Sequence, residues 1–131
     1  MLIDAGAPVS HSHPVLTLGP AHVLRFPADV TLTVLIHEQM HWAANTLANT
    51  PAAIEEARRR WPNPPDRAHG AAHDARSTWL HFPVCALETS AMTDILGADR
   101  ALAANRVVPW YRWIYDQLLL LPAGLDADRS A

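Results

Sequence analysis

The segment VTLTVLIHEQMHWAANTL, residues 30–47, decides how the chain folds around it. It contains neither glycine nor proline, so nothing in it interrupts a helix. Its first residues are largely β-branched and, taken alone, would suit a strand. Spacings of three and four residues nevertheless mark one helical face, made by Val30, Val34, His37, His41 and Ala44. That periodicity favours an α-helix from position 30 to about position 47, with Asp29 as its N-cap.

Two short apolar runs precede this helix, at residues 14–18 and 22–26, separated by Gly-Pro-Ala. Such runs on either side of a turn sequence predict a β-hairpin. The fold class expected is therefore α+β: a small, mainly helical domain with an N-terminal hairpin or small sheet beside the 30–47 helix.

Further helices are expected downstream. Thr50 and Pro51 have the character of an N-cap and a first helical residue, so a short amphipathic helix should follow them. Proline-rich residues 62–70 predict a loop. We expect a long helix over about 71–96, kinked or restarted at Pro83 and ended by Gly97. The remaining expectations are a short helix over 98–105, a last helix opening at Pro109, and a frayed tail over 126–131.

Composition narrows the class of protein. The chain has 131 residues, 50% of them hydrophobic, which suits one domain spanning residues 1–131 with a packed core. Its formal net charge of −3 argues against a nucleic-acid partner. No run approaches the roughly 18 apolar residues that cross a bilayer, and residues 1–14 do not have the pattern of a signal peptide. The single cysteine, Cys85, excludes an internal disulfide, so a cytoplasmic location is expected.

The pattern His-Glu-x-x-His occupies residues 37–41. Residues four apart lie one turn apart on one helical face, so His37 and His41 can bind one metal ion. Glu38 stands beside such an ion and can accept a proton from water, which is the chemistry of zinc hydrolases with this motif. About one chain in 70 of this composition would contain the motif by chance. The alternative is two surface histidines with a solvated glutamate.

A catalytic zinc site needs a third protein ligand. The metzincin pattern would place Gly at position 44 and His at position 47, but the chain has Ala44 and Leu47. Glu55 and Glu56 adjoin three arginines, and exposed ion pairs at helical spacing explain them better.

Glu88 is the strongest candidate for the third ligand. It lies on the apolar face of the segment at 79–96, where an unpaired carboxylate would be costly. The alternative is a buried ion pair with Arg106 or Arg112. His81 lies two turns before Glu88 on the same face, and three roles stay open for it besides a core histidine: a group that orients a ligand, a hydrogen-bond donor in the transition state, or an alternative ligand.

Other residues are weaker candidates for a role in the site. Tyr111 and Tyr115 could donate a hydrogen bond to a developing oxyanion, although packing is the default role for them. His69 and His73 share the four-residue spacing but no glutamate follows His69, which suggests a surface pair or a weak adventitious metal site instead of a second catalytic centre. Asp94 could orient a ligand histidine, but it lies off the face of the preceding candidates.

The motifs HEQMH (37–41) and CALETSAMTDILG (85–97) together resemble those of gluzincin-type zincin-like metallopeptidases. The resemblance implies a zinc cofactor held by the two motif histidines and Glu88, with the motif glutamate as general base. It also implies a small sheet beside the active-site helix. In the family pattern an aspartate follows the ligand glutamate by four residues, whereas Asp94 follows Glu88 by six.

Two functions follow as hypotheses. The first is a zinc-dependent peptidase acting on peptide or protein substrates, with Glu38 as base and with His81 or Tyr115 as donors to the oxyanion. The second is a catalytically inert zincin-fold domain that holds a structural metal or none and acts through a partner. The C-terminal run WIYDQLLLL (113–121) could form the face of a homodimer.

Overall fold

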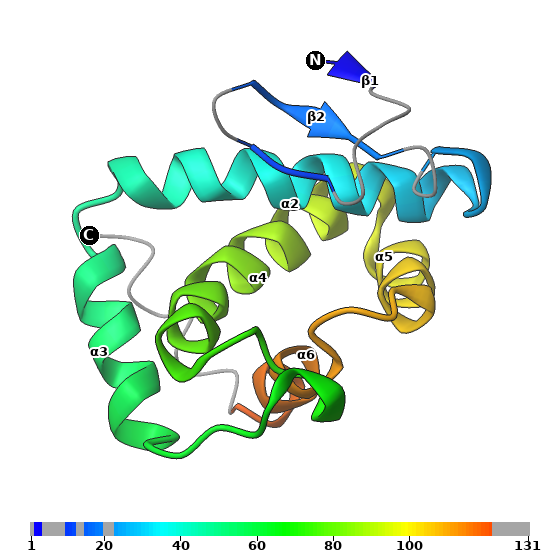
Figure 1. Ribbon diagram of the computed structural model, residues 1–131. Helices are drawn as coiled ribbons and strands as arrows, with labels where there is room; N and C mark the ends of the chain where they lie inside the picture. The colour runs from blue at the N-terminus through cyan, green and yellow to red at the C-terminus, as the bar shows by residue number, and fades with distance from the viewer. Residues whose placement is uncertain (1, 4–9, 13–14, 20–22, 122–131) are drawn as a thin grey trace.

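The computed structural model describes residues 2–3, 10–12, 15–19 and 23–121, and these form a mainly helical structure (Figure 1). The helices are α2 (Ala28–Thr46), α3 (Thr50–Arg60), the 3-10 helix η1 (Arg67–His69), α4 (Ala75–Leu96), α5 (Ala98–Val107) and α6 (Arg112–Leu120). The prediction of a mainly helical chain is confirmed. None of the described helices is long and apolar enough to cross a membrane.

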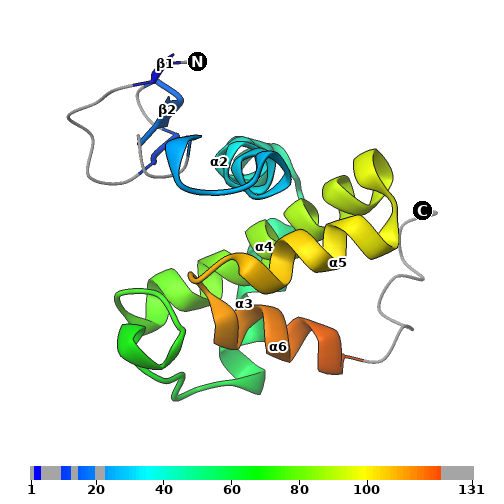
Figure 2. The ribbon, with the colours of Figure 1, turned by 90° about the vertical axis from the view of Figure 1, so that its right-hand side faces the viewer.

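Helix α4 lies at the centre of the structure and contacts α2, α3, α5 and α6. Helix α2 crosses on one side of α4, and α6 lies on the other (Figures 1 and 2). A helix covered on several sides must be apolar on several faces. The fully buried Val84 and Cys85 of α4 meet that requirement. The Phe82 ring stacks on the Trp61 ring at the end of α3, with centroids 4.2 Å apart and planes 5° apart.

Both ends of α4 are fixed by local chemistry. The helix begins at Ala75, not near residue 71, because the Asp74 side chain caps it by accepting a hydrogen bond of 2.7 Å from the Ser77 N–H. The helix continues through Pro83 without ending there. Gly97 closes it with φ of 82°, as predicted, since glycine adopts this backbone conformation without a steric penalty.

The N-terminal hairpin prediction is wrong. Only β2 (Thr17–Leu18) forms within the first apolar run, and it pairs in parallel with β1 (Leu2–Ile3). In the second run, residues 23–24 are helical and residues 25–26 form a bend; residues 14 and 22 lie outside the described ranges. The Phe26 ring instead packs edge-on against Trp110, with centroids 5.7 Å apart. Packing on the helical core therefore overrides the local preference for a strand.

Two predicted helix starts also differ. Pro27 is the N-cap residue of α2, and Asp29 lies in its first turn, where it pairs with Arg100 at 2.8 Å. The last helix opens at Arg112 instead of Pro109, after Tyr111 in a left-handed conformation with φ of 56°. The Arg112 guanidinium donates hydrogen bonds to the carbonyls of Asn105 and Val108, which closes the end of α5 before α6 begins. The tail at 126–131 lies outside the described residues.

Candidate metal centre

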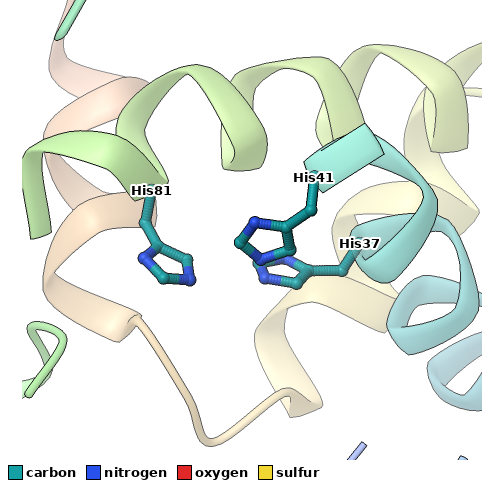
Figure 3. Close-up of side chains that lie close together, drawn as sticks. All are labelled: His37, His41 and His81. Carbon is teal, nitrogen blue, oxygen red and sulfur yellow. The ribbon is translucent and has the colours of Figure 1, made fainter. Parts of the chain in front are cut away.

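Helices α2 and α4 bring three histidine side chains together. His37 and His41 lie one turn apart on α2, and His81 faces them from α4 (Figure 3). Their ring centroids are 5.1 Å apart for His37 and His41, 5.6 Å for His37 and His81, and 5.0 Å for His41 and His81. One ring nitrogen from each residue lies within 4.8 Å of the others. That spacing allows all three to ligate one ion.

The orientation of His37 is set by a buried carboxylate. Its Nδ1 lies 2.9 Å from Oε2 of Glu88, a residue of α4 that is 1% exposed. A carboxylate accepts, so Nδ1 carries the proton and donates it to Glu88. The Tyr115 hydroxyl donates to the same Oε2 at 2.5 Å. Nε2 of His37 is thereby left with its lone pair, which is the form a metal needs.

His81 is held in the same tautomer by a different partner. Its Nδ1 donates to the backbone carbonyl of Ser77, one turn earlier on α4, at 2.7 Å. Burial, with the nearby His37 adding to it and the hydrogen bond to Ser77 opposing it, lowers the pKa of His81 to about 4. His81 is therefore neutral near pH 7 and offers Nε2 as a lone-pair donor.

Glu88, predicted as the third ligand, contacts His37 and belongs to a second possible ligand group. Among the described residues, the groups with ligand spacing are His37 with His41 and His81, and His37 with Cys85 and Glu88. Glu88 thus lies on the Nδ1 side of His37 and shares no ligand group with His41. The alternative of an ion pair between Glu88 and Arg106 or Arg112 is not found among the described residues.

The second of these groups is closed to solvent. His37 is 7% exposed, Cys85 is 0% exposed and Glu88 is 1% exposed, so a ligand could not reach an ion held there. Burial and the charge of Glu88 raise the pKa of the Cys85 thiol well above its usual value. A protonated thiol is a poor metal ligand. The three-histidine group is therefore the better candidate metal centre.

The two tyrosines named from the sequence have different positions. The Tyr115 hydroxyl donates a hydrogen bond to Glu88, and Tyr115 is 2% exposed. Tyr115 is therefore buried on the Glu88 side of His37. The Tyr111 side chain contacts two of the three histidine rings. Its ring stacks on His81 with centroids 4.4 Å apart and on His37 with centroids 5.3 Å apart. Burial, with the neighbouring Cys85 and Glu38 adding to it, raises the pKa of Tyr111 to about 12.

Glu38 follows the ligand candidate His37 directly on α2 and is partly buried there. His69 and His73 belong elsewhere: each is exposed and pairs with a neighbouring aspartate, His69 with Asp66 at 2.6 Å and His73 with Asp74 at 3.1 Å. Asp94 is exposed at the far end of α4.

One functional partner was missed in the sequence. Ser77 orients His81 through its backbone carbonyl. The four-residue spacing between them on one helix could have indicated this contact.

Comparisons with protein-family models, with curated proteins and with solved structures give no match for this chain. The chemistry of the centre is therefore argued from its own geometry.

Proposed function

We propose that the protein is a zinc-dependent hydrolase, with His37, His41 and His81 as the zinc ligands and Glu38 as the general base. The observation that carries this proposal is the convergence of three histidine rings from two packed helices, with ligand nitrogens within 4.8 Å of one another. This ligand set departs from the gluzincin expectation, since His81 replaces Glu88.

The donor set fits zinc. Three neutral imidazoles with a fourth position for water or substrate is an established arrangement for catalytic zinc. Metal-ligating histidines also donate their other ring N–H to a carboxylate or a carbonyl. His37 does so to Glu88 and His81 to Ser77. A zinc ion bound there would polarise a carbonyl oxygen and lower the pKa of a bound water to about 7.

The residues around the ligands have separate roles in the proposed reaction. Glu38 follows His37 directly on α2, which places its carboxylate beside the ligands rather than among them. From there it accepts a proton from the nucleophilic water and returns it to the leaving group. Glu88 accepts hydrogen bonds from His37 and from Tyr115, and these contacts fix the orientation of the His37 ring. Tyr111 limits the access of water, because its ring covers His37 and His81. Peptide bonds are the first substrates to test.

The test is the Glu38→Gln variant, compared with the wild type for zinc content by elemental analysis and for turnover of a fluorogenic peptide library. We expect about one zinc per chain in both proteins and a loss of turnover of at least about 100-fold in the variant. Glu55→Gln is the matched control, because Glu55 is exposed on α3 and, among the residues that the structure describes, pairs only with Arg58 at 3.5 Å. Undiminished turnover by the Glu38 variant would remove Glu38 from the mechanism.

A second candidate is an inert domain with a structural zinc. The observation that favours it is the low exposure of the centre, with His37 and His81 each 7% exposed under the Tyr111 ring. This candidate predicts zinc binding without turnover, and a lower unfolding temperature after chelation of the metal. Size-exclusion chromatography of the same samples tests the proposed homodimer through α6, on which Leu119 and Leu120 are exposed.

A further inference from the structure

An open cavity of about 910 Å³ lies along α4 and is separate from the three histidines, none of which lines it. Residues of α3, α5 and α6 line its sides. Four of the α4 residues that line it follow one face of the helix at helical spacing: Pro83, Leu87, Ser90 and Asp94. We call this cavity the α4 groove.

The lining of the α4 groove is mostly apolar. Trp61 and Phe82 both line it, and their rings stack with centroids 4.2 Å apart. Short side chains leave the space beside them open, among them Ala53, Ala86 and Ala98. Cavities of roughly 300–1,000 Å³ with apolar walls and a few polar groups are typical of small-molecule sites. The size and the lining of the groove therefore suit an apolar small molecule.

The charged groups of the α4 groove favour a cation. They comprise three carboxylates and one guanidinium, those of Glu56, Glu88, Asp94 and Arg60. Glu56 pairs with Arg60 at 2.5 Å, and the buried Glu88 accepts two hydrogen bonds within the chain. The Asp94 carboxylate is exposed and makes no ion pair or hydrogen bond with another residue of the described ranges. Asp94 is therefore the carboxylate of the groove that is open to a cationic partner.

The apolar and the acidic groups lie toward different ends of the groove. Phe82 and Asp94 belong to the same helix, and a rise of about 1.5 Å per residue separates them by about 18 Å along its axis. Leu87 lies between them, so the apolar lining continues from Phe82 toward the carboxylate. A ligand with an apolar body and a cationic head matches this arrangement.

We propose that the α4 groove binds a small amphiphilic cation, with its apolar body against Trp61 and Phe82 and its ammonium group at Asp94. Burial of the apolar body supplies most of the affinity, because an exposed ion pair contributes only about 0.2–1 kcal/mol. The ammonium group supplies the preference for a cation. This site goes beyond the proposed zinc hydrolase, and binding there does not require the metal.

The probes are octylammonium, octanol and octanoate, which share one alkyl chain and differ in the charge of the head group. Each is titrated by calorimetry into the full-length protein as purified. We expect octylammonium to bind most tightly and octanol severalfold more weakly. Octanoate should bind at least about tenfold more weakly than octylammonium, because it loses the attraction to Asp94 and meets repulsion instead. Octanoate binding as tight as that of octylammonium would overturn the inference.

Two substitutions test the two ends of the ligand. Asp94→Asn should weaken octylammonium binding about two- to fivefold and leave octanol binding unchanged. Asp99→Asn is the matched control, because Asp99 is exposed on α5 and does not line the groove. Ala53→Trp should weaken binding of all three probes at least about tenfold by filling the groove. Ala52→Trp is its control, since Ala52 is the exposed neighbour on α3 that does not line the groove.

All variants are checked for the wild-type unfolding temperature. Equal binding of octylammonium by Asp94→Asn and Asp99→Asn would overturn the placement of the ammonium group. Equal binding of the probes by Ala53→Trp and Ala52→Trp would overturn the α4 groove as the site. Size-exclusion chromatography covers another occupant: a wild-type dimer that Ala53→Trp alone dissociates would show that a second copy of the chain fills the groove instead.

Discussion

The Tyr115 hydroxyl and the Nδ1–H of His37 donate to one and the same oxygen, Oε2 of Glu88, at 2.5 Å and 2.9 Å. Glu88 is 1% exposed, so these two donors are what compensate the burial of its carboxylate. The contact joins α6 to α2 through α4. On the proposed function, Tyr115 and Glu88 therefore act as positioning residues for His37.

Replacing Glu88 with glutamine is expected to weaken zinc binding without abolishing it. Loss of the partner that orients a ligand histidine costs about 10–100-fold in metal affinity. His81→Ala removes a ligand and should cost more than about 100-fold. Competition with a chromophoric chelator measures both constants. Equal or reversed effects would restore Glu88 as the third ligand in place of His81.

The Tyr115→Phe variant is expected to lose about 1–3 kcal/mol in its free energy of unfolding, because the buried Glu88 carboxylate loses one of its two donors. Tyr111→Phe is the control of identical chemistry, since the Tyr111 hydroxyl has no hydrogen-bond partner within the described ranges. Its change should stay within about 0.5 kcal/mol. Urea unfolding of the metal-free proteins measures both. Similar losses in the two variants would contradict the assignment of the buried hydrogen bond.

The metal-free protein should become less stable as the pH falls from about 6.5 toward 4. Burial lowers the pKa of His81 from 6.5 to about 4 in the folded chain, so in this window the unfolded chain binds a proton that the folded chain does not. The contribution is complete above pH 6.5 and is lost progressively below it, to a total of about 2–4 kcal/mol. Urea unfolding at several pH values measures this slope. His81→Asn should reduce the slope, whereas substitution of the exposed His73 should not.

Gly70→Ala is expected to destabilise the protein more than Gly97→Ala. Both glycines have positive φ, 93° and 82°, so each alanine pays about 1–2 kcal/mol of backbone strain. At Gly70 the new Cβ also meets the Trp113 nitrogen at 2.8 Å, while at Gly97 no atom lies within 4 Å. Thermal and urea unfolding compare the two variants. A larger loss at Gly97 would show that the turn at 66–71 can move away from α6.

The sequence by itself determined the helical segments and half of the candidate centre. Periodicity without glycine or proline predicted α2, and within it the one-turn spacing of His37 and His41 follows from helix geometry alone. It also marked Glu88 and His81 as polar residues on an apolar helix. Local signals were less reliable at helix starts, because residues in the first turns of α2 and α6 contact residues outside those helices, Asp29 with Arg100 and Arg112 with Asn105.

Only the tertiary structure determined which position each of these residues takes at the candidate centre. Glu88 and His81 share one face of α4, and spacing along that helix does not say which of them meets His41. The crossing of α2 over α4 sets this, by placing His81 beside His41 and Glu88 beside Nδ1 of His37. The positions of Tyr111 and Tyr115 likewise depend on where α6 packs. Contacts between residues far apart in the chain depend on the packing of whole helices, which local periodicity does not specify.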